Sequence, residues 1–229
     1  MPQADENADG ARGRRYPPPP RAEPAWHAQA AVLLAIALEL LLPERVTAGP
    51  RWLIPVLEGA LLVGLVIATP RRLERPHTRR RRLALALIMF VTLANISSLA
   101  MLSHELLHHD IGNGRGLIFA GVLIWLTNVV IFGLWYWETD RGGPGLRAAG
   151  RDRAPDLLFP QMAGDDIGPW DWRPQLIDYL YVSLTNATAL SPTDTMPLTP
   201  IAKSVMGAQA LVSLVTIGLV VARAVNILQ

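Results

Sequence analysis

Residues 178–194 read Asp178-Tyr-Leu-Tyr-Val-Ser-Leu-Thr-Asn-Ala-Thr-Ala-Leu-Ser-Pro-Thr-Asp194, and a long apolar run follows from Ile201 to Leu228. Roughly 20 apolar residues in a helix cross the hydrocarbon of a bilayer, so the run alone is long enough to span one. The stretch before it is short, rich in hydroxyl groups and interrupted by a proline. Together they predict a short helix, a polar turn and a transmembrane helix.

The rest of the chain has the same pattern. Hydrophobic residues make up 51% of the 229 residues, and arginine clusters separate them into segments. The apolar segments are 26–42, 52–69, 83–102, 117–137, 174–190 and 201–228. We therefore predict an all-α integral membrane protein with six hydrophobic helices, namely four full spans, a short fifth helix and a long last span.

These segments divide the chain into four parts. Residues 1–24 are charged and proline-rich, which is typical of a disordered tail. Residues 25–137 form a predicted four-helix transmembrane region, and 138–173 a loop rich in glycine and proline. Residues 174–229 hold the short helix, the turn and the last span. The chain has no cysteine, which excludes disulfides, thiolate catalysis and cysteine-ligated metals.

The arginines predict the orientation of the chain in the membrane. The tail has four arginines, the second loop seven and the loop at 138–173 five, whereas the first and third loops have two and one. Positively charged loops stay in the cytoplasm, so we predict a multi-pass protein of the cell membrane with a cytoplasmic N-terminus. Six spans would also make the C-terminus cytoplasmic. The same loops explain the sequence pI of about 9.4 without a nucleic-acid partner.

The segment at 174–190 allows two arrangements. If it spans the membrane, the polar turn lies outside and the last helix returns to the cytoplasm, which agrees better with the charges. If it enters and comes back, the chain has five spans and a re-entrant loop. Irregular backbone at membrane depth must then be buried in protein or line water.

The stretch from Asp178 to Thr185, with the Thr-Asp-Thr-Met-Pro that begins at Thr193, resembles the pore helix, filter and last helix of the potassium-channel superfamily. The C-terminal part also resembles a family of uncharacterised bacterial multi-pass membrane proteins. Ser191 and Thr193 stand where channel filters have glycine. The resemblance implies a channel-like path for ions or small solutes, completed by homo-oligomerisation. Its expected lining residues are Asp178, Thr185, Asn186, Thr188, Ser191, Thr193 and Asp194.

A second interpretation involves no transport. The same polar side chains would then hydrogen-bond between helices, as small polar residues do in membrane bundles, and the protein would be a scaffold or accessory subunit. Glu39 and Glu58, inside the first two apolar runs, predict either a pair near the headgroups or a proton or cation step.

The sequence His104-Glu-Leu-Leu-His108 has the spacing of a zinc site, with two histidines on one helical face and a glutamate beside the first. Asp110 would be a third ligand only if the helix breaks there. We interpret the motif first as an interfacial polar cluster, with a membrane metalloenzyme as the weaker alternative. The sequence therefore predicts no enzymatic activity and no cofactor.

A run of four arginines precedes the third apolar segment, namely Arg79, Arg80, Arg81 and Arg82. Such clusters beside a membrane span attract the anionic headgroups of the cytoplasmic leaflet. We predict that these residues bind lipid headgroups.

Overall fold

The computed structural model describes residues 23–47, 49–50, 52–68, 78–108, 114–149, 153–162, 172–188 and 194–227. Nearly all of the tail predicted at 1–24 lies outside these residues. The helices in chain order are α1 (Trp26–Leu40), α2 (Leu53–Ala68), α3 (Thr78–His108), α4 (Gly114–Thr139), α5 (Pro144–Ala148), α6 (Leu176–Thr188) and α7 (Pro200–Ile227). Short 3₁₀ turns lie at η1 (Glu44–Val46), η3 (Asp140–Gly142) and η4 (Pro160–Met162), and two short strands at β1 (Leu157–Leu158) and β2 (Met196–Pro197).

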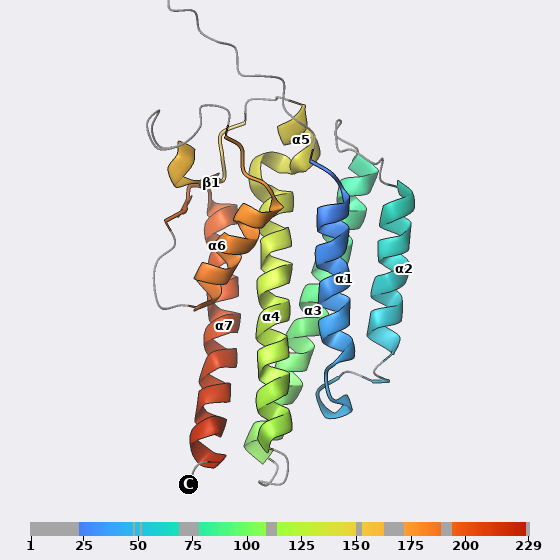
Figure 1. Cartoon of the computed structure of the whole chain (residues 1–229), viewed down its shortest axis with the longest axis vertical. Coiled ribbons are helices and arrows are strands. Elements are labelled where there is room, and N and C mark those ends of the chain that lie inside the picture. The colour runs from blue at the N-terminus through green and yellow to red at the C-terminus, as the bar shows by residue number, and fades with distance from the viewer. Residues whose placement is uncertain are drawn as a thin grey trace, which may run out of the picture.

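The five longest helices form an up-and-down bundle (Figure 1). α1, α3 and α7 run one way, while α2 and α4 run the other way. Arginines 79–82 lie at the start of α3, and Arg141 and Arg147 follow α4, so these cations share one end of the bundle. We call it the arginine-rich end and the other the distal end.

Three helical stretches are long and apolar enough to cross a membrane, namely Thr78–Leu106, Arg115–Gly142 and Pro200–Val225. α1 and α2 are apolar but have only 15 and 16 residues. The all-helical prediction is confirmed. Of the four full spans predicted before residue 138, the two at 83–102 and 117–137 lie in helices long enough to cross a membrane. The first two are shorter helices, because the turn around η1 takes up the residues between the end of α1 and the start of α2.

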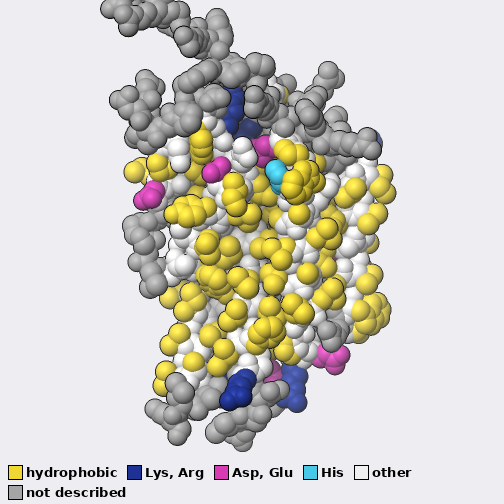
Figure 2. All heavy atoms as spheres, in the orientation of Figure 1, with side chains coloured by type: hydrophobic (Ala, Val, Ile, Leu, Met, Phe, Trp, Pro, Cys, Tyr) yellow, Lys and Arg dark blue, Asp and Glu magenta, His cyan; other side chains and the backbone are white. Residues whose placement is uncertain are grey.

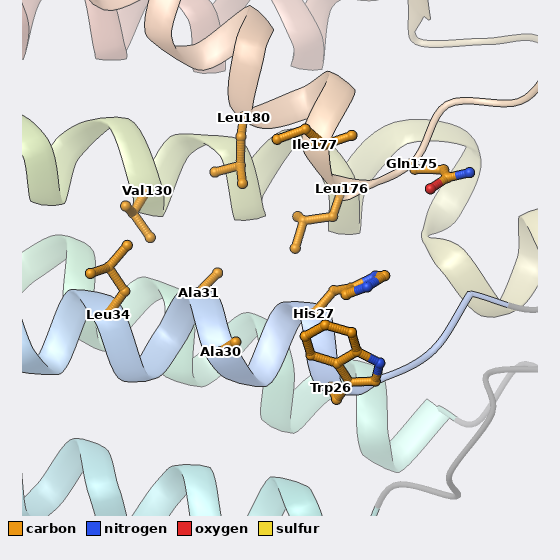
Figure 3. Close-up of a pocket in the computed structure, with 10 residues that line it drawn as sticks. All are labelled: Trp26, His27, Ala30, Ala31, Leu34, Val130, Gln175, Leu176, Ile177 and Leu180. Atoms are coloured by element: carbon orange, nitrogen blue, oxygen red, sulfur yellow. The ribbon is translucent and has the colours of Figure 1, made fainter.

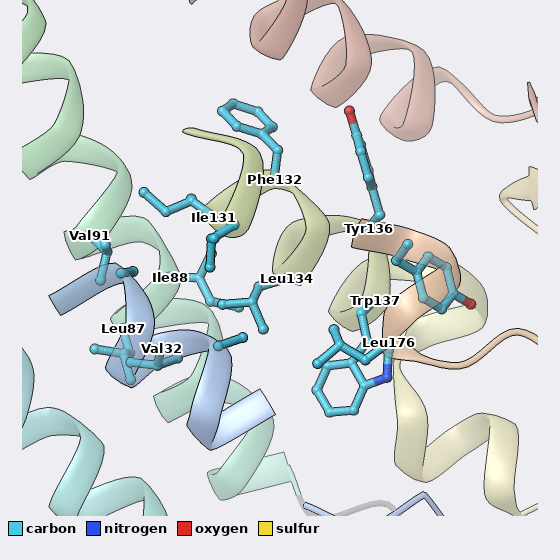
Figure 4. Close-up of a cluster of buried hydrophobic side chains, with 14 of the residues drawn as sticks. Val32, Leu87, Ile88, Val91, Ile131, Phe132, Leu134, Tyr136, Trp137 and Leu176 are labelled. Carbon is cyan, nitrogen blue, oxygen red and sulfur yellow. The ribbon is translucent and has the colours of Figure 1, made fainter. Parts of the chain in front are cut away.

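α4 is the central helix of the bundle, in contact with α1, α3, α6 and α7. Within the apolar stretch of α4, 67% of the residues are buried inside the protein, against 17% within that of α7. The larger hydrophobic cluster, in Figure 4, brings together Val32 of α1, Leu87 of α3, Ile131 of α4 and Leu176 of α6. α4 thus supports the other helices, and α7 packs on one side only.

Hydrophobic side chains cover the middle of the face shown in Figure 2, and the charged side chains gather toward its two ends. The exposed apolar residues include Leu33 of α1, Val63 of α2, Phe119 of α4, and Leu211 and Leu214 of α7. A soluble protein rarely exposes so large an apolar surface. The surface fits a protein whose solvent at this level is lipid.

Candidate functional site

The segment around α6 enters and leaves the bundle at the same end. Strand β1, which precedes α6, pairs antiparallel with β2, which follows it, with Leu157 opposite Pro197. The backbone N–H of Leu198 also donates to the carbonyl of Asp156 at 2.8 Å. α7 then starts at the arginine-rich end, where α4 finished (Figure 1). α6 is therefore re-entrant with respect to the bundle, since the segments before and after it lie at the same end.

The length of α6 explains this geometry. Its 13 residues reach about 20 Å at 1.5 Å per residue, which is less than the ~30 Å of a bilayer core. Its last turn lies beside the middle of α4, because the indole N–H of Trp125 donates to the carbonyl of Ala187 at 3.3 Å. Trp125 is the twelfth of the 26 residues of α4. The carboxyl end of α6 therefore stops halfway along the bundle.

The re-entrant α6 also changes the placement of the chain ends. The start of α1 lies at the arginine-rich end and the end of α7 at the distal end (Figure 1). The prediction that both termini share one side of a membrane depends on a sixth crossing and stays a prediction.

Two aspartates tie the two ends of the re-entrant segment to α4. The carboxylate of Asp140, just after α4, accepts the hydroxyl of Tyr179 at 2.6 Å and the backbone N–H of Asp156 at 2.9 Å. The carboxylate of Asp156 accepts the backbone N–H of Arg141 and the hydroxyl of Thr199, both at 2.7 Å. Asp140 and Tyr179 are fully buried. The contacts fix the first turns of both α6 and α7.

Ion pairs surround these aspartates. Arg80 donates to Glu138 at 3.0 Å, and both side chains are buried. Arg147 pairs with Glu23 at 3.3 Å and donates to the carbonyls of Trp137 and Asp140. Buried charges are stable only when paired and hydrogen-bonded in this way. Arg80 is thus turned into the bundle, whereas Arg79 and Arg82, also predicted as headgroup ligands, are exposed and Arg81 is half-buried.

A line of polar side chains joins α4, α6 and α7 deeper in the bundle. We call Tyr136, Ser183, Asn186 and Gln209 the polar seam. Gln209 accepts hydrogen bonds from the Tyr136 hydroxyl and from Asn186, the latter at 2.9 Å. Its own amide donates to the Ser183 hydroxyl at 2.7 Å, and that hydroxyl donates to the carbonyl of Val129 at 2.6 Å. The seam therefore joins α6 to both α4 and α7 by hydrogen bonds.

The predicted path residues on α6 have different surroundings. Asn186 belongs to the polar seam. The hydroxyl of Thr185 donates to the carbonyls of Tyr181 and Val182, both at 3.0 Å, and that of Thr188 donates to the carbonyl of Thr185 at 2.7 Å. Both hydroxyls are therefore hydrogen-bonded to backbone carbonyls of α6 itself.

The remaining predicted path residues lie nearer the arginine-rich end or beyond the described residues. The carboxylate of Asp178 accepts the backbone N–H of Gln175 at 2.7 Å, so it caps the start of α6. Asp194 is exposed. Ser191 and Thr193 lie outside the described residues.

The predicted zinc motif lies at the distal end of α3. His104 is exposed and Glu105 is half-buried, while His108 is the last residue of the helix. Asp110, the proposed third ligand, lies outside the described residues. Among the residues that the structure describes, no three metal-binding side chains come together.

Glu39 and Glu58 meet between α1 and α2 rather than at the surface. Glu39 is 6% exposed and Glu58 is fully buried, and they interact electrostatically. Neither oxygen of Glu58 has a hydrogen-bond partner among the described residues. The two carboxylates therefore lie inside the bundle and not at the surface position expected for a headgroup pair.

Sequence reasoning did not identify Asp140, Asp156, Tyr179 or Gln209 as parts of one assembly. A signal was present, because Glu138 and Asp140 directly follow an apolar run where arginine is otherwise the dominant charge. Asp140 is 39 residues from its partner Tyr179 and Glu138 is 58 residues from Arg80, and spacing along the chain predicts no such pairs. Comparison of the chain with protein-family models, curated proteins and solved structures gave no match.

Proposed function

We propose that this chain is an integral membrane protein with five transmembrane helices, α1 to α4 and α7, in which α6 helps to form a path for ions or small solutes. Under the positive-inside rule the arginine-rich end faces the cytoplasm. α6 then enters the membrane from the cytoplasmic side, and the end of α7 lies on the opposite side.

The observation that carries the proposal is the position of the carboxyl end of α6 beside Trp125. Of the last four carbonyls of α6, that of Ala187 accepts the Trp125 indole N–H and that of Thr185 accepts the Thr188 hydroxyl, whereas those of Asn186 and Thr188 have no partner among the described residues. At membrane depth such groups must be covered by protein or water, since lipid cannot hydrogen-bond them. A second copy of the chain, a water-filled path, or both would meet this need. The exposed side chains Ile177, Tyr181 and Leu184 offer one face of α6 for such contact.

The polar seam favours a second candidate function, a membrane scaffold without transport. Asn186 and Gln209 bind each other and their neighbours, and this leaves their amide groups engaged inside one subunit. In this interpretation α6 is a rigid wedge whose polar groups serve packing.

Flux through purified protein in vesicles separates the two functions. We expect release of several cations or small solutes above that of empty vesicles. Because the chain has no native cysteine, Thr185→Cys gives a single thiol on the predicted path, and an impermeant thiol reagent should reduce the flux. Ser103→Cys is the matched control, since that half-buried hydroxyl also bonds to its own helix, at 2.7 Å from the Leu99 carbonyl.

Absence of flux for all tested solutes, with protein in both orientations, would refute transport and leave the scaffold. Equal block of the Thr185→Cys and Ser103→Cys proteins would show that any path does not follow α6. Neither substitution is expected to disturb the fold, because both thiols replace hydroxyls that are hydrogen-bonded only to their own helix.

A further inference from the structure

A cavity of about 430 Å³ opens at the side of the bundle between α1, α4 and α6. Its walls include Trp26, His27, Leu34, Val130, Gln175 and Leu180 (Figure 3). This volume is within the range of about 300–1,000 Å³ that is typical of small-molecule sites. α6 is tilted against the bundle (Figure 1), so the space beside its first turns remains unfilled by side chains.

The cavity is polar at one end and apolar along its length. Trp26, His27 and Gln175 lie at its end nearest the arginine-rich end, and Leu34, Val130 and Leu180 lie farther along (Figure 3). The eight residue steps from Trp26 to Leu34 correspond to roughly 12 Å of helix. One leaflet contributes about half of the ~30 Å hydrocarbon core. The cavity thus has the length and the polarity of one lipid acyl chain below its headgroup.

The charges near the polar end favour an anion. Arg173 is exposed, lies two residues before Gln175 and makes no ion pair within the described part of the chain. Two nearby carboxylates among the described residues are already engaged, because Glu23 pairs with Arg147 and Asp178 accepts the Gln175 N–H. Indole groups such as that of Trp26 are also common at the depth of the headgroups.

We propose that this cavity holds an acyl chain of an anionic phospholipid from the leaflet at the arginine-rich end, with its phosphate near Arg173. The inference rests on the membrane placement in the proposed function but not on transport. Since Leu176, Ile177 and Leu180 of α6 form one wall, the bound lipid would brace the re-entrant helix against α1.

Native mass spectrometry of the delipidated protein tests the proposal by titration with phosphatidylglycerol and phosphatidylcholine of the same acyl chains. Ala30→Phe places a ring in the cavity, because Ala30 is an exposed residue of its wall. Ala60→Phe, at an exposed alanine of α2 outside the cavity, is the matched control. We expect Ala30→Phe to weaken the tightest phosphatidylglycerol site about ten-fold, the factor for roughly two buried methylene groups, and the control to leave it unchanged.

Arg173→Gln should weaken phosphatidylglycerol about five-fold and leave phosphatidylcholine unchanged, since one interfacial cation contributes about 1 kcal/mol to anionic lipid binding. Ala30→Leu repeats the first test with a smaller side chain if the phenylalanine variant elutes as aggregate. Equal binding of both lipids to the wild type, or equal effects of the Ala30 and Ala60 variants, would overturn the proposal. Carbonate extraction of the membranes separately tests membrane insertion, so failure of the lipid site and failure of the placement are distinguishable.

Discussion

The hydroxyl of Tyr179 is expected to stabilise the docked position of α6. It donates to the buried carboxylate of Asp140 at 2.6 Å, and Tyr179→Phe removes this bond while keeping the ring. The ring contacts would remain, because Phe159 meets it edge-on at 5.4 Å and the Arg147 guanidinium lies 5.2 Å from its centre. The change therefore isolates a single hydrogen bond.

A hydrogen bond to a charged group contributes about 1.5–3 kcal/mol to stability. Asp140 keeps the backbone N–H of Asp156 but loses its only hydroxyl donor among the described residues. We therefore expect Tyr179→Phe to destabilise docked α6 by about 1.5–3 kcal/mol. By the relation of 1.4 kcal/mol per factor of ten, this raises the open fraction of α6 about ten- to hundred-fold.

A single thiol on the buried face of α6 measures this fraction. Val182 is 1% exposed, and Val182→Cys introduces a smaller side chain into a protein without other cysteines. The labelling rate of this thiol in detergent should rise about ten- to hundred-fold when Tyr179→Phe is added. Tyr181→Phe is the control, since Tyr181 lies on the same helix and is 62% exposed. Equal labelling rates in the two double variants would refute the stabilising role of the Tyr179–Asp140 bond.

Two further substitutions test the packing of α4. A Cβ atom on Gly133 would lie 2.6 Å from the nearest side-chain atom of α6. Gly133→Ala should therefore destabilise the protein by about 1–3 kcal/mol in denaturant unfolding. Gly59→Ala is the control and should cause no loss of stability, because a Cβ there has no atom within 4 Å. Arg80→Met leaves the buried Glu138 carboxylate unpaired and should cost about 3–5 kcal/mol in the same assay, with most of it recovered by Arg80→Met combined with Glu138→Leu. Arg79→Met at an exposed site should change stability by less than about 0.5 kcal/mol. If Gly59→Ala destabilised the protein as much as Gly133→Ala, or Arg79→Met as much as Arg80→Met, the packing argument would be refuted.

Hydrophobic length predicted the helices well, because a run of apolar residues is a local property of the chain. The predicted run Ile201 to Leu228 and the observed α7, Pro200–Ile227, differ by one residue at each end. Pro200 and the hydroxyl of Thr199, which accepts the Ala202 N–H at 3.3 Å, define the start of this helix. Local capping chemistry therefore sets the boundary that the apolar pattern only approximates.

Hydrophobic length could not predict the direction of the chain after α6, although the short apolar segment left a re-entrant arrangement open. A helix of 13 residues can either span a locally thinned membrane or turn back, and the contacts at its two ends decide between these arrangements. Here they are held by Asp140 and Asp156, whose partners are far away in the chain. The charges favoured a sixth crossing because that crossing returns the last helix, with Arg223 near its end, to the cytoplasmic side. Arg223 is 7% exposed and lies near the end of α7, which reaches the distal end of the bundle (Figure 1).

The same reasoning limits what the polar seam means for function. In the proposed membrane placement, burying apolar surface between helices gains little, so a short helix such as α6 depends on hydrogen bonds. Ser183, Asn186 and Gln209 supply these bonds whether or not solute passes. Their polarity is therefore explained by docking alone, and they carry no argument for a path. The argument for a path comes instead from the α6 carboxyl end. Trp125 and Thr188 cover two of its last four carbonyls, and in the proposed membrane placement the carbonyls of Asn186 and Thr188 need a partner that lipid cannot provide.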